Sequence, residues 1–260
     1  MSNRTKSNSL RTAILVGALA LSQAAFAGRV VLDNDEWTFT YVGFGVASSS
    51  TTALAQNLAA FVNVDGGSCN LLIYSSNFGL TQSYLNTALT GAGCSVSYST
   101  GAFDLATLSG FDGVFLGGAQ YGYDAATLTS YVNSGHSVYI AGGTGTVAHE
   151  DTAWDSFTHT FGLDFGPSYN GIDGLLDIAT NDPLFAGVSQ LYFNNGNTIS
   201  LHGSNPHARI VPGIDGLFGV YDDTSRLTPT VDVNAVPEPA SLALLGLGLA
   251  GLAASRRRRG

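Results

Sequence analysis

The chain has 260 residues and a formal net charge of −9, from 10 Lys and Arg against 19 Asp and Glu. Its basic residues gather near the two ends, so residues 28–235 hold only three arginines against eighteen acidic residues, a net charge of −15. Such a surface repels nucleic acid, phosphate-rich ligands and anionic lipid headgroups, which excludes a nucleic-acid partner.

The first 27 residues have the pattern of a secretory signal peptide. Arg4, Lys6 and Arg11 precede the apolar run AILVGALAL, and the small residues of AFA at 25–27 stand before Gly28. This pattern predicts export and cleavage after residue 27, with a retained N-terminal anchor as the alternative.

Residues 28–230 are expected to form one domain in which short apolar runs alternate with helix-like segments. Strands are predicted over 70–76, 95–99, 112–118 and 137–143, and helices over 51–62, 80–93, 104–111 and 124–135. This alternation predicts an α/β fold with a mostly parallel sheet and helices on both faces. Beyond residue 150 we expect a helix at 151–161, then strands near 174–179, 190–193, 198–202, 208–211 and 217–221. These form the far side of the sheet and an antiparallel extension.

The two cysteines stand at the starts of two predicted strands. Cys69 opens CNLLIYSS and Cys94 opens CSVSYST. If these strands are parallel neighbours, their first residues lie side by side within disulfide range. An exported protein meets an oxidising compartment, so a Cys69–Cys94 disulfide is predicted, with two buried thiols as the alternative. A zinc site is not expected, because no histidine pair matches them.

Three stretches, GFDGVFLGG, DAATLTSYVNSGHSVYIAGGTG and AWDSFTHTFGL, together resemble the glutamine amidotransferase-like fold and its many relatives without amidotransferase activity. The resemblance covers about residues 70–211. In the enzymes a strained strand-to-helix turn presents a cysteine nucleophile. The comparable turn here, Gly142 to Thr146, has no cysteine, so the family's chemistry is not expected.

The same turn, GGTGT, resembles a phosphate-binding loop but lacks its lysine and its spacing. A tight strand-to-helix turn is the better interpretation. Thr144 or Thr146 as a nucleophile, with His149 as its base, is the alternative.

The stretch HEDTAWDSFTH differs from a helical zinc motif, since the position four residues after His149 is Ala153. We expect a core-facing stripe of Trp154, Phe157 and Phe161. On the same helix, Asp155 and His159 are spaced to pair. A cation or catalytic site is the alternative. His202 and His207 are expected to stabilise a turn between two late strands, with a ligand role for His202 as the alternative. No metal and no cofactor are predicted.

The stretch DNDEW at 33–37 groups three carboxylates without the spacing of a calcium-binding loop. We interpret it as the acidic start of a strand, with weak surface calcium binding as the alternative.

Ligands of open parallel sheets bind outside the carboxyl ends of the strands. Hydroxyls, amides and tyrosines dominate there, which suits a neutral sugar and suggests extracellular polysaccharide as a partner. We therefore expect a non-enzymatic binding or structural module. The alternative is a secreted glycan hydrolase that uses Asp and Glu carboxylates. The candidate residues of this cleft are Ser75, Asn77, Gln120, Tyr121, Thr144, His149 and His202.

Residues 231–260 form a tail of distinct composition. Val236, Pro237, Glu238 and Pro239 precede an uncharged run from Ala240 to Ala254, which is followed by four arginines. The run is long enough to span most of a bilayer as a helix, and it predicts a C-terminal transmembrane helix. Its alternative is a buried core helix. The flanking cations, expected on the cytoplasmic side, are Arg256, Arg257, Arg258 and Arg259.

This order of Pro-Glu-Pro motif, apolar helix and arginine cluster resembles the PEP-CTERM sorting signal. The resemblance implies recognition of Pro237, Glu238 and Pro239 by exosortase, a membrane protease. It also implies transient residence in the inner membrane of a Gram-negative bacterium. Release to the cell surface or extracellular matrix, where polysaccharide is found, would follow.

Overall fold

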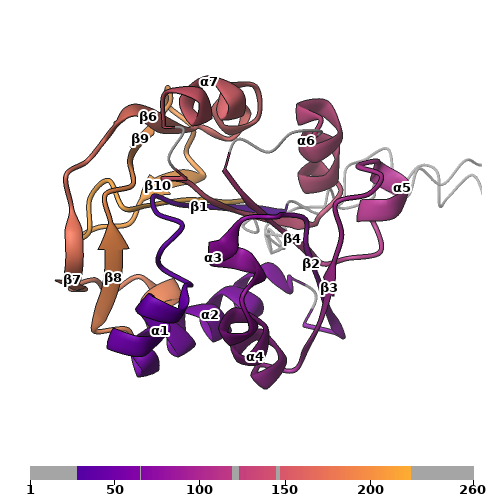
Figure 1. Cartoon of the computed structure of the whole chain (residues 1–260). Helices are drawn as coiled ribbons and strands as arrows, with labels where there is room; N and C mark the ends of the chain where they lie inside the picture. The colour runs from indigo at the N-terminus through magenta and orange to yellow at the C-terminus, as the bar shows by residue number, and fades with distance from the viewer. Residues whose placement is uncertain (1–27, 65, 119–122, 145–146, 224–260) are drawn as a thin grey trace, which may run out of the picture.

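The computed structural model describes residues 28–64, 66–118, 123–144 and 147–223. A seven-stranded sheet runs through the centre of this part, in the order β10-β11-β1-β5-β4-β2-β3 (Figure 1). The five strands from β1 to β3 in this order are mutually parallel, and β11 and β10 extend the sheet antiparallel. The parallel strands are β1 (Arg29–Asp33), β2 (Cys69–Ile73), β3 (Cys94–Tyr98), β4 (Gly113–Gly117) and β5 (Ser137–Ala141). The antiparallel strands are β10 (Ala208–Ile210) and β11 (Phe218–Asp222).

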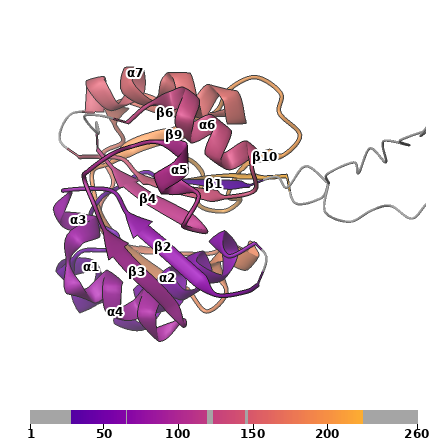
Figure 2. The same ribbon diagram turned by 90° about the vertical axis from the view of Figure 1, so that its right-hand side faces the viewer.

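Helices cover both faces of this sheet, as the α/β prediction requires. Figures 1 and 2 show α1, α2 and α4 on one face and α6 and α7 on the other. The first face carries α1 (Tyr41–Val46), α2 (Ser48–Val62), α3 (Phe78–Thr81) and α4 (Ser83–Gly91). The second carries α5 (Leu105–Leu108), α6 (Ala125–Asn133) and α7 (Val147–Thr158).

Two apolar layers hold the helices to the sheet. Leu71 and Ile73 of β2 point into the layer beneath α2 and α4, whereas Leu72 between them points into the layer beneath α6 and α7. All five residues of β4 and all five of β5 are buried. Strands covered on both faces read as continuous apolar runs, which is why the sequence predicted them well.

The predicted disulfide is confirmed. Cys69 and Cys94 are register partners at the starts of the parallel neighbours β2 and β3, with 4.5 Å between their Cα atoms. Their sulfur atoms are bonded, and the described part of the chain has no free cysteine.

The second half of the domain differs from the prediction. Of the described strands after residue 150, only β10 and β11 join the seven-stranded sheet. The other late strands form two separate antiparallel ribbons: β6 (Leu163–Tyr169) with β9 (Asn197–Leu201), and β7 (Asp173–Asp177) with β8 (Gln190–Asn194). Each ribbon turns alternate apolar residues into one of the two layers, Phe165 and Ile199 beneath α7 and Leu191 and Phe193 beside α2. Strand pairing depends on which edge is available, and the apolar pattern alone does not specify it.

Two short 3-10 helices complete the described part, η1 (His159–Phe161) after α7 and η2 (Pro183–Phe185). None of the helices within the described ranges is both long and apolar enough to cross a bilayer. The predicted signal peptide and the predicted transmembrane tail lie outside those ranges.

The connections place a topological switch point between β2 and β4. From β2 the chain passes to β3 on one side, then returns across β2 to form β4 on the other. In open α/β sheets this is where the ends of the connecting loops diverge and leave room for a ligand.

Candidate functional site at the carboxyl edge of the sheet

The stretch DNDEW lies at the end of a strand, which corrects the prediction that it starts one. Asp33 is the last residue of β1, and Asp35 and Glu36 follow it at the carboxyl edge. All three are buried, so they do not form the surface calcium site considered as an alternative. The strand is RVVLD, in which three apolar residues follow Arg29, and no predicted strand covered it.

Asp33 anchors this loop to the sheet. Its carboxylate accepts hydrogen bonds from the Tyr139 hydroxyl at 2.7 Å and from the Asp35 backbone N–H at 3.2 Å. Burial raises its pKa well above the usual value, against the lowering effect of the Tyr139 bond. We infer that this group stabilises the loop, because its oxygens are occupied by the protein itself.

Asp35 connects the loop to the β7–β8 ribbon. It accepts hydrogen bonds from the backbone N–H groups of Trp37, at 2.9 Å, and of Asn194. Burial raises its pKa to about 6, although these backbone bonds favour the charged form.

Glu36 reaches the turn after β2. Its carboxylate accepts a hydrogen bond from the Asn77 side-chain amide, while the Asn77 oxygen caps α3 by accepting from Gly79 N–H at 2.8 Å. Burial raises the pKa of Glu36 to about 7. The Asn77 bond opposes this rise, and repulsion from Asp35 and Glu150 adds to it. Glu36 is therefore partly protonated near neutral pH and can both donate and accept hydrogen bonds.

Glu150 holds the turn between β5 and α7. It accepts from Gly143 N–H at 2.9 Å, from Thr144 N–H at 3.0 Å and from the Thr144 hydroxyl. Burial raises its pKa above the usual value. These contacts fix the Glu150 side chain to the turn between β5 and α7.

The glycines of this turn allow close approach of two loops. Gly143 has φ +70°, and a Cβ there would lie 2.7 Å from Gly196 Cα and 2.8 Å from the Asn34 carbonyl oxygen. This is the tight turn that the sequence analysis favoured over a phosphate-binding loop. The Thr144 hydroxyl bonds Glu150, and His149 is exposed on α7.

An aromatic patch lies beside the carboxyl groups; we define it as Trp37, Tyr41, Phe78 and Tyr192. The ring centroids of Trp37 and Phe78 are 5.0 Å apart, and those of Trp37 and Tyr192 are 6.4 Å apart. Tyr41 is 58% exposed and Phe78 is 38% exposed. The patch is assembled from the β1 loop, α1, α3 and β8. No spacing in the sequence could therefore have indicated it.

The structure places the predicted cleft residues in two separate regions. Ser75, Asn77 and Thr144 lie at the carboxyl edge; Ser75 is buried and accepts the Asn77 N–H at 2.9 Å. Gln120 and Tyr121 lie outside the described ranges. His202 follows β9, beyond the far end of α7, and this 12-residue helix is roughly 18 Å long.

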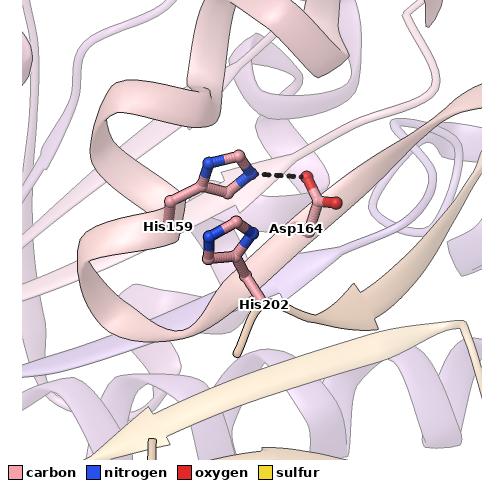
Figure 3. A group of neighbouring side chains, drawn as sticks. All are labelled: His159, Asp164 and His202. Carbon is pink, nitrogen blue, oxygen red and sulfur yellow. Dashed lines mark hydrogen bonds and ion pairs between the residues drawn. The ribbon is translucent and has the colours of Figure 1, made fainter. Parts of the chain in front are cut away.

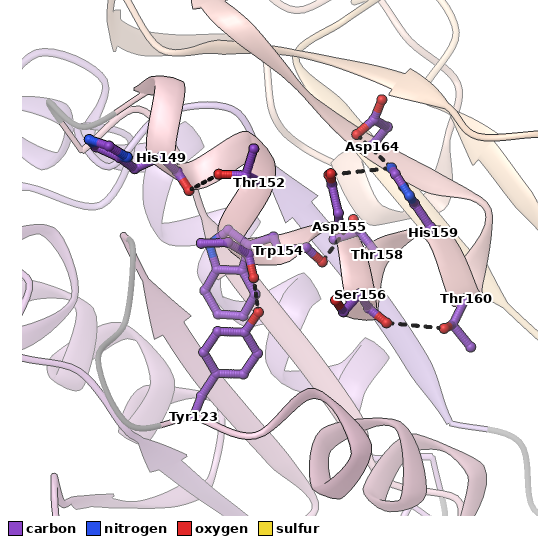
Figure 4. A network of polar contacts seen from close by, with 11 residues as sticks. Tyr123, His149, Thr152, Trp154, Asp155, Ser156, Thr158, His159, Thr160 and Asp164 are labelled. Carbon is purple, nitrogen blue, oxygen red and sulfur yellow. Dashed lines mark hydrogen bonds and ion pairs between the residues drawn. The ribbon is translucent and has the colours of Figure 1, made fainter.

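His202 belongs to a polar cluster at that far end. Figure 3 draws it with His159 and Asp164, and Figure 4 shows the contacts of His159 with Asp155 and Asp164. The ring of His202 stacks on that of His159, with 3.6 Å between the centroids. His159 also approaches Asp164 at 3.1 Å and Asp155 at 3.4 Å, so the predicted pair of Asp155 and His159 is confirmed. The predicted core stripe on this helix is confirmed as well, since all three of its side chains are buried: Trp154, Phe157 and Phe161.

Comparison with known proteins adds one finding about the tail. Residues 235–259 match the PEP-CTERM protein-sorting motif. The PEP-CTERM signal is recognised by exosortase, a membrane protease, and directs export through the membrane to the cell surface. The match covers the predicted motif Val236 to Pro239 and the arginine cluster, Arg256 to Arg259. No curated protein and no solved structure matches the chain.

Proposed function

We propose that the exported body is a non-enzymatic module that binds extracellular polysaccharide at the carboxyl edge of its sheet. The observation that carries this proposal is the aromatic patch beside the hydrogen-bonded pair of Glu36 and Asn77. The patch offers exposed ring surface, and the pair offers donors and acceptors next to it.

This combination suits a neutral sugar ring. One face of such a ring carries C–H groups that pack on aromatic surface, while its hydroxyls need both donors and acceptors. A carboxyl group with a pKa of about 7 and an amide supply both. Both arginines of the described part lie elsewhere: Arg29 at the start of β1, and Arg209 on β10 in an ion pair with Asp182.

A secreted glycan hydrolase is the second candidate. It is favoured by the proximity of Glu36 and Glu150, the only two glutamates of the body, since a glycosidase needs two carboxyl groups with different roles. We favour binding because both oxygens of Glu150 are engaged by the β5–α7 turn. Glu150 therefore has no unengaged oxygen with which to serve as the second carboxyl group beside Glu36.

We extend the proposal to the two ends of the chain and to the family resemblance of the body. We propose that residues 1–27 are removed as a signal peptide, and that residues 231–260 span the inner membrane of a Gram-negative cell until exosortase cuts. The amidotransferase-like resemblance of the body also remains a proposal. It is supported by the parallel sheet and by the turn after β5.

The test is retention of the purified full-length chain on insoluble neutral glycans, with cellulose, chitin and agarose as probes. Trp37→Ala and Phe78→Ala should each weaken retention about tenfold or more, because each removes ring surface at the centre of the patch. Tyr98→Ala is the matched control. Tyr98 is 45% exposed and ends β3, and its hydroxyl accepts a hydrogen bond from Asn86 of α4 at 3.1 Å. It is therefore not part of the aromatic patch, and its loss should leave retention unchanged.

Absence of retention on every probe, or equal retention of Trp37→Ala and the native chain, would count against the proposal. If the native chain released new reducing ends from these glycans and Glu36→Gln did not, the protein would be a glycan hydrolase instead.

A further inference from the structure

Two imidazoles and two carboxylates converge near the far end of α7, away from the proposed polysaccharide site. His159 opens η1, Asp155 lies one helical turn before it, Asp164 is on β6 and His202 follows β9. One ligand atom each of His159, Asp164 and His202 lie within 4.8 Å of one another. Figure 3 shows the two rings one above the other, with Asp164 beside them.

The distances around His159 are close to those between ligands that share one metal ion. Zinc bonds to histidine nitrogen and carboxylate oxygen are about 2.0–2.2 Å, so two ligands at a tetrahedral angle stand roughly 3.3–3.5 Å apart. His159 Nε2 lies 3.4 Å from Asp155 Oδ1 and 3.1 Å from Asp164 Oδ1. Asp155 Oδ1 is buried and accepts no hydrogen bond from the described residues.

The cluster carries uncompensated negative charge. Asp151 adds a third carboxylate, and its oxygen lies within 4.8 Å of those of Asp155 and Asp164. The body has no lysine, and the two arginines among the described residues, Arg29 and Arg209, pair with other carboxylates, Asp222 and Asp182. A divalent cation would supply the missing charge.

An ion can reach the cluster from solvent. An open pocket of about 490 Å³ is lined by both His159 and His202, and the side chain of His159 is 31% exposed. The imidazoles decide the type of ion, because they favour zinc and its neighbours over calcium or magnesium.

We propose that His159, Asp164 and His202 form a binding site for Zn²⁺, with Asp155 beside His159. The two rings are nearly parallel, at 11°, so their in-plane lone pairs cannot both meet one ion as they stand. His202 is exposed at the start of a loop, and its ring turns out of the stack on binding.

The experiment is equilibrium dialysis of the untagged, chelator-treated full-length chain against Zn²⁺, with the imidazole protons followed by NMR. We expect about one ion per chain, and a shift of the His159 and His202 ring signals as the stack opens. His202→Ala and the isosteric Asp164→Asn should each weaken binding at least about tenfold. His149→Ala, which removes an exposed imidazole from the same helix, should not.

We expect all variants to have the same melting temperature without metal. That result would show that weaker binding comes from loss of a ligand and not from loss of the fold. Failure to bind Zn²⁺ at micromolar concentration, or unchanged binding in His202→Ala, would overturn the site. Preferential Ca²⁺ binding that survives His202→Ala would also overturn it, because the carboxylates alone would then hold the ion. The polysaccharide proposal is tested independently by Trp37→Ala.

Discussion

Glu36 lies where three separate parts of the chain meet. It belongs to the loop after β1, accepts a hydrogen bond from Asn77 after β2, and is repelled by Glu150 of α7. A carboxyl group in this position is 8% exposed and has its pKa raised to about 7. Asp35 beside it has a pKa of about 6 for the same main reason, burial. Such values place the titration of this edge close to neutral pH.

These two carboxyl groups should make stability depend on pH. Their pKa values in the folded chain lie above the usual 3.8 for Asp35 and 4.5 for Glu36, so the folded state binds protons more tightly than the unfolded state. The free energy of unfolding should therefore be larger near pH 4.5 than near pH 8, and should fall as pH rises through 6 to 7. For Glu36 alone the loss should be on the order of 2 kcal/mol.

Glu36→Gln keeps an oxygen that can accept from Asn77 but does not titrate. Urea unfolding at a series of pH values should show a flatter profile between pH 5 and 8 than the native chain. A profile of unchanged slope would mean that Glu36 titrates normally.

The elements are held in place by a few specific contacts besides their apolar faces. β3 is the edge strand of the sheet and has only one buried residue, Cys94, whereas β4 and β5 are buried throughout. An edge strand with so little buried surface gains little from packing. The disulfide to Cys69 compensates by joining its start to β2.

Cys94→Ser should therefore destabilise the domain. The bridge closes a loop with a sequence separation of 25, and restriction of the unfolded chain by such a loop is worth about 3 kcal/mol. Chemical denaturation should show this loss, and a reducing agent should lower the stability of the native chain to the level of the variant. Ser95→Ala, an exposed change at the next residue of β3, should have little effect. If reduction leaves the unfolding midpoint unchanged, the bridge does not stabilise the fold.

At the scale of the whole molecule, the negative charge of the body and the sorting signal of the tail both fit a protein exported to the cell surface. The acidic body repels phosphate-rich surfaces, and the basic tail carries the PEP-CTERM signal at residues 235–259. The body is therefore suited to work away from anionic membrane surfaces. This arrangement is consistent with a surface protein that is separated from its tail after export.

Cleavage at the tail is directly measurable. In cells that contain exosortase, intact mass should show a mature chain without the arginine cluster, and deletion of the protease should leave the cluster attached. Glu238→Ala should block processing because it removes the acidic residue of the motif, while Asp232→Ala, just outside the matched segment, should be processed normally. Equal processing of both variants would exclude Glu238 from recognition.

The sequence by itself determined the sorting tail, the alternation of strands and helices, the disulfide and the core stripe of α7. Each of these is a local pattern: a motif, a period, or two cysteines at strand starts that parallel pairing must bring together. Tertiary structure alone decided that the acidic stretch DNDEW ends a strand, that Trp37, Phe78 and Tyr192 share one patch, and that His159 and His202 meet. Those contacts join residues that are 41 to 155 positions apart, and no local period records which loops a folded sheet will bring to the same edge.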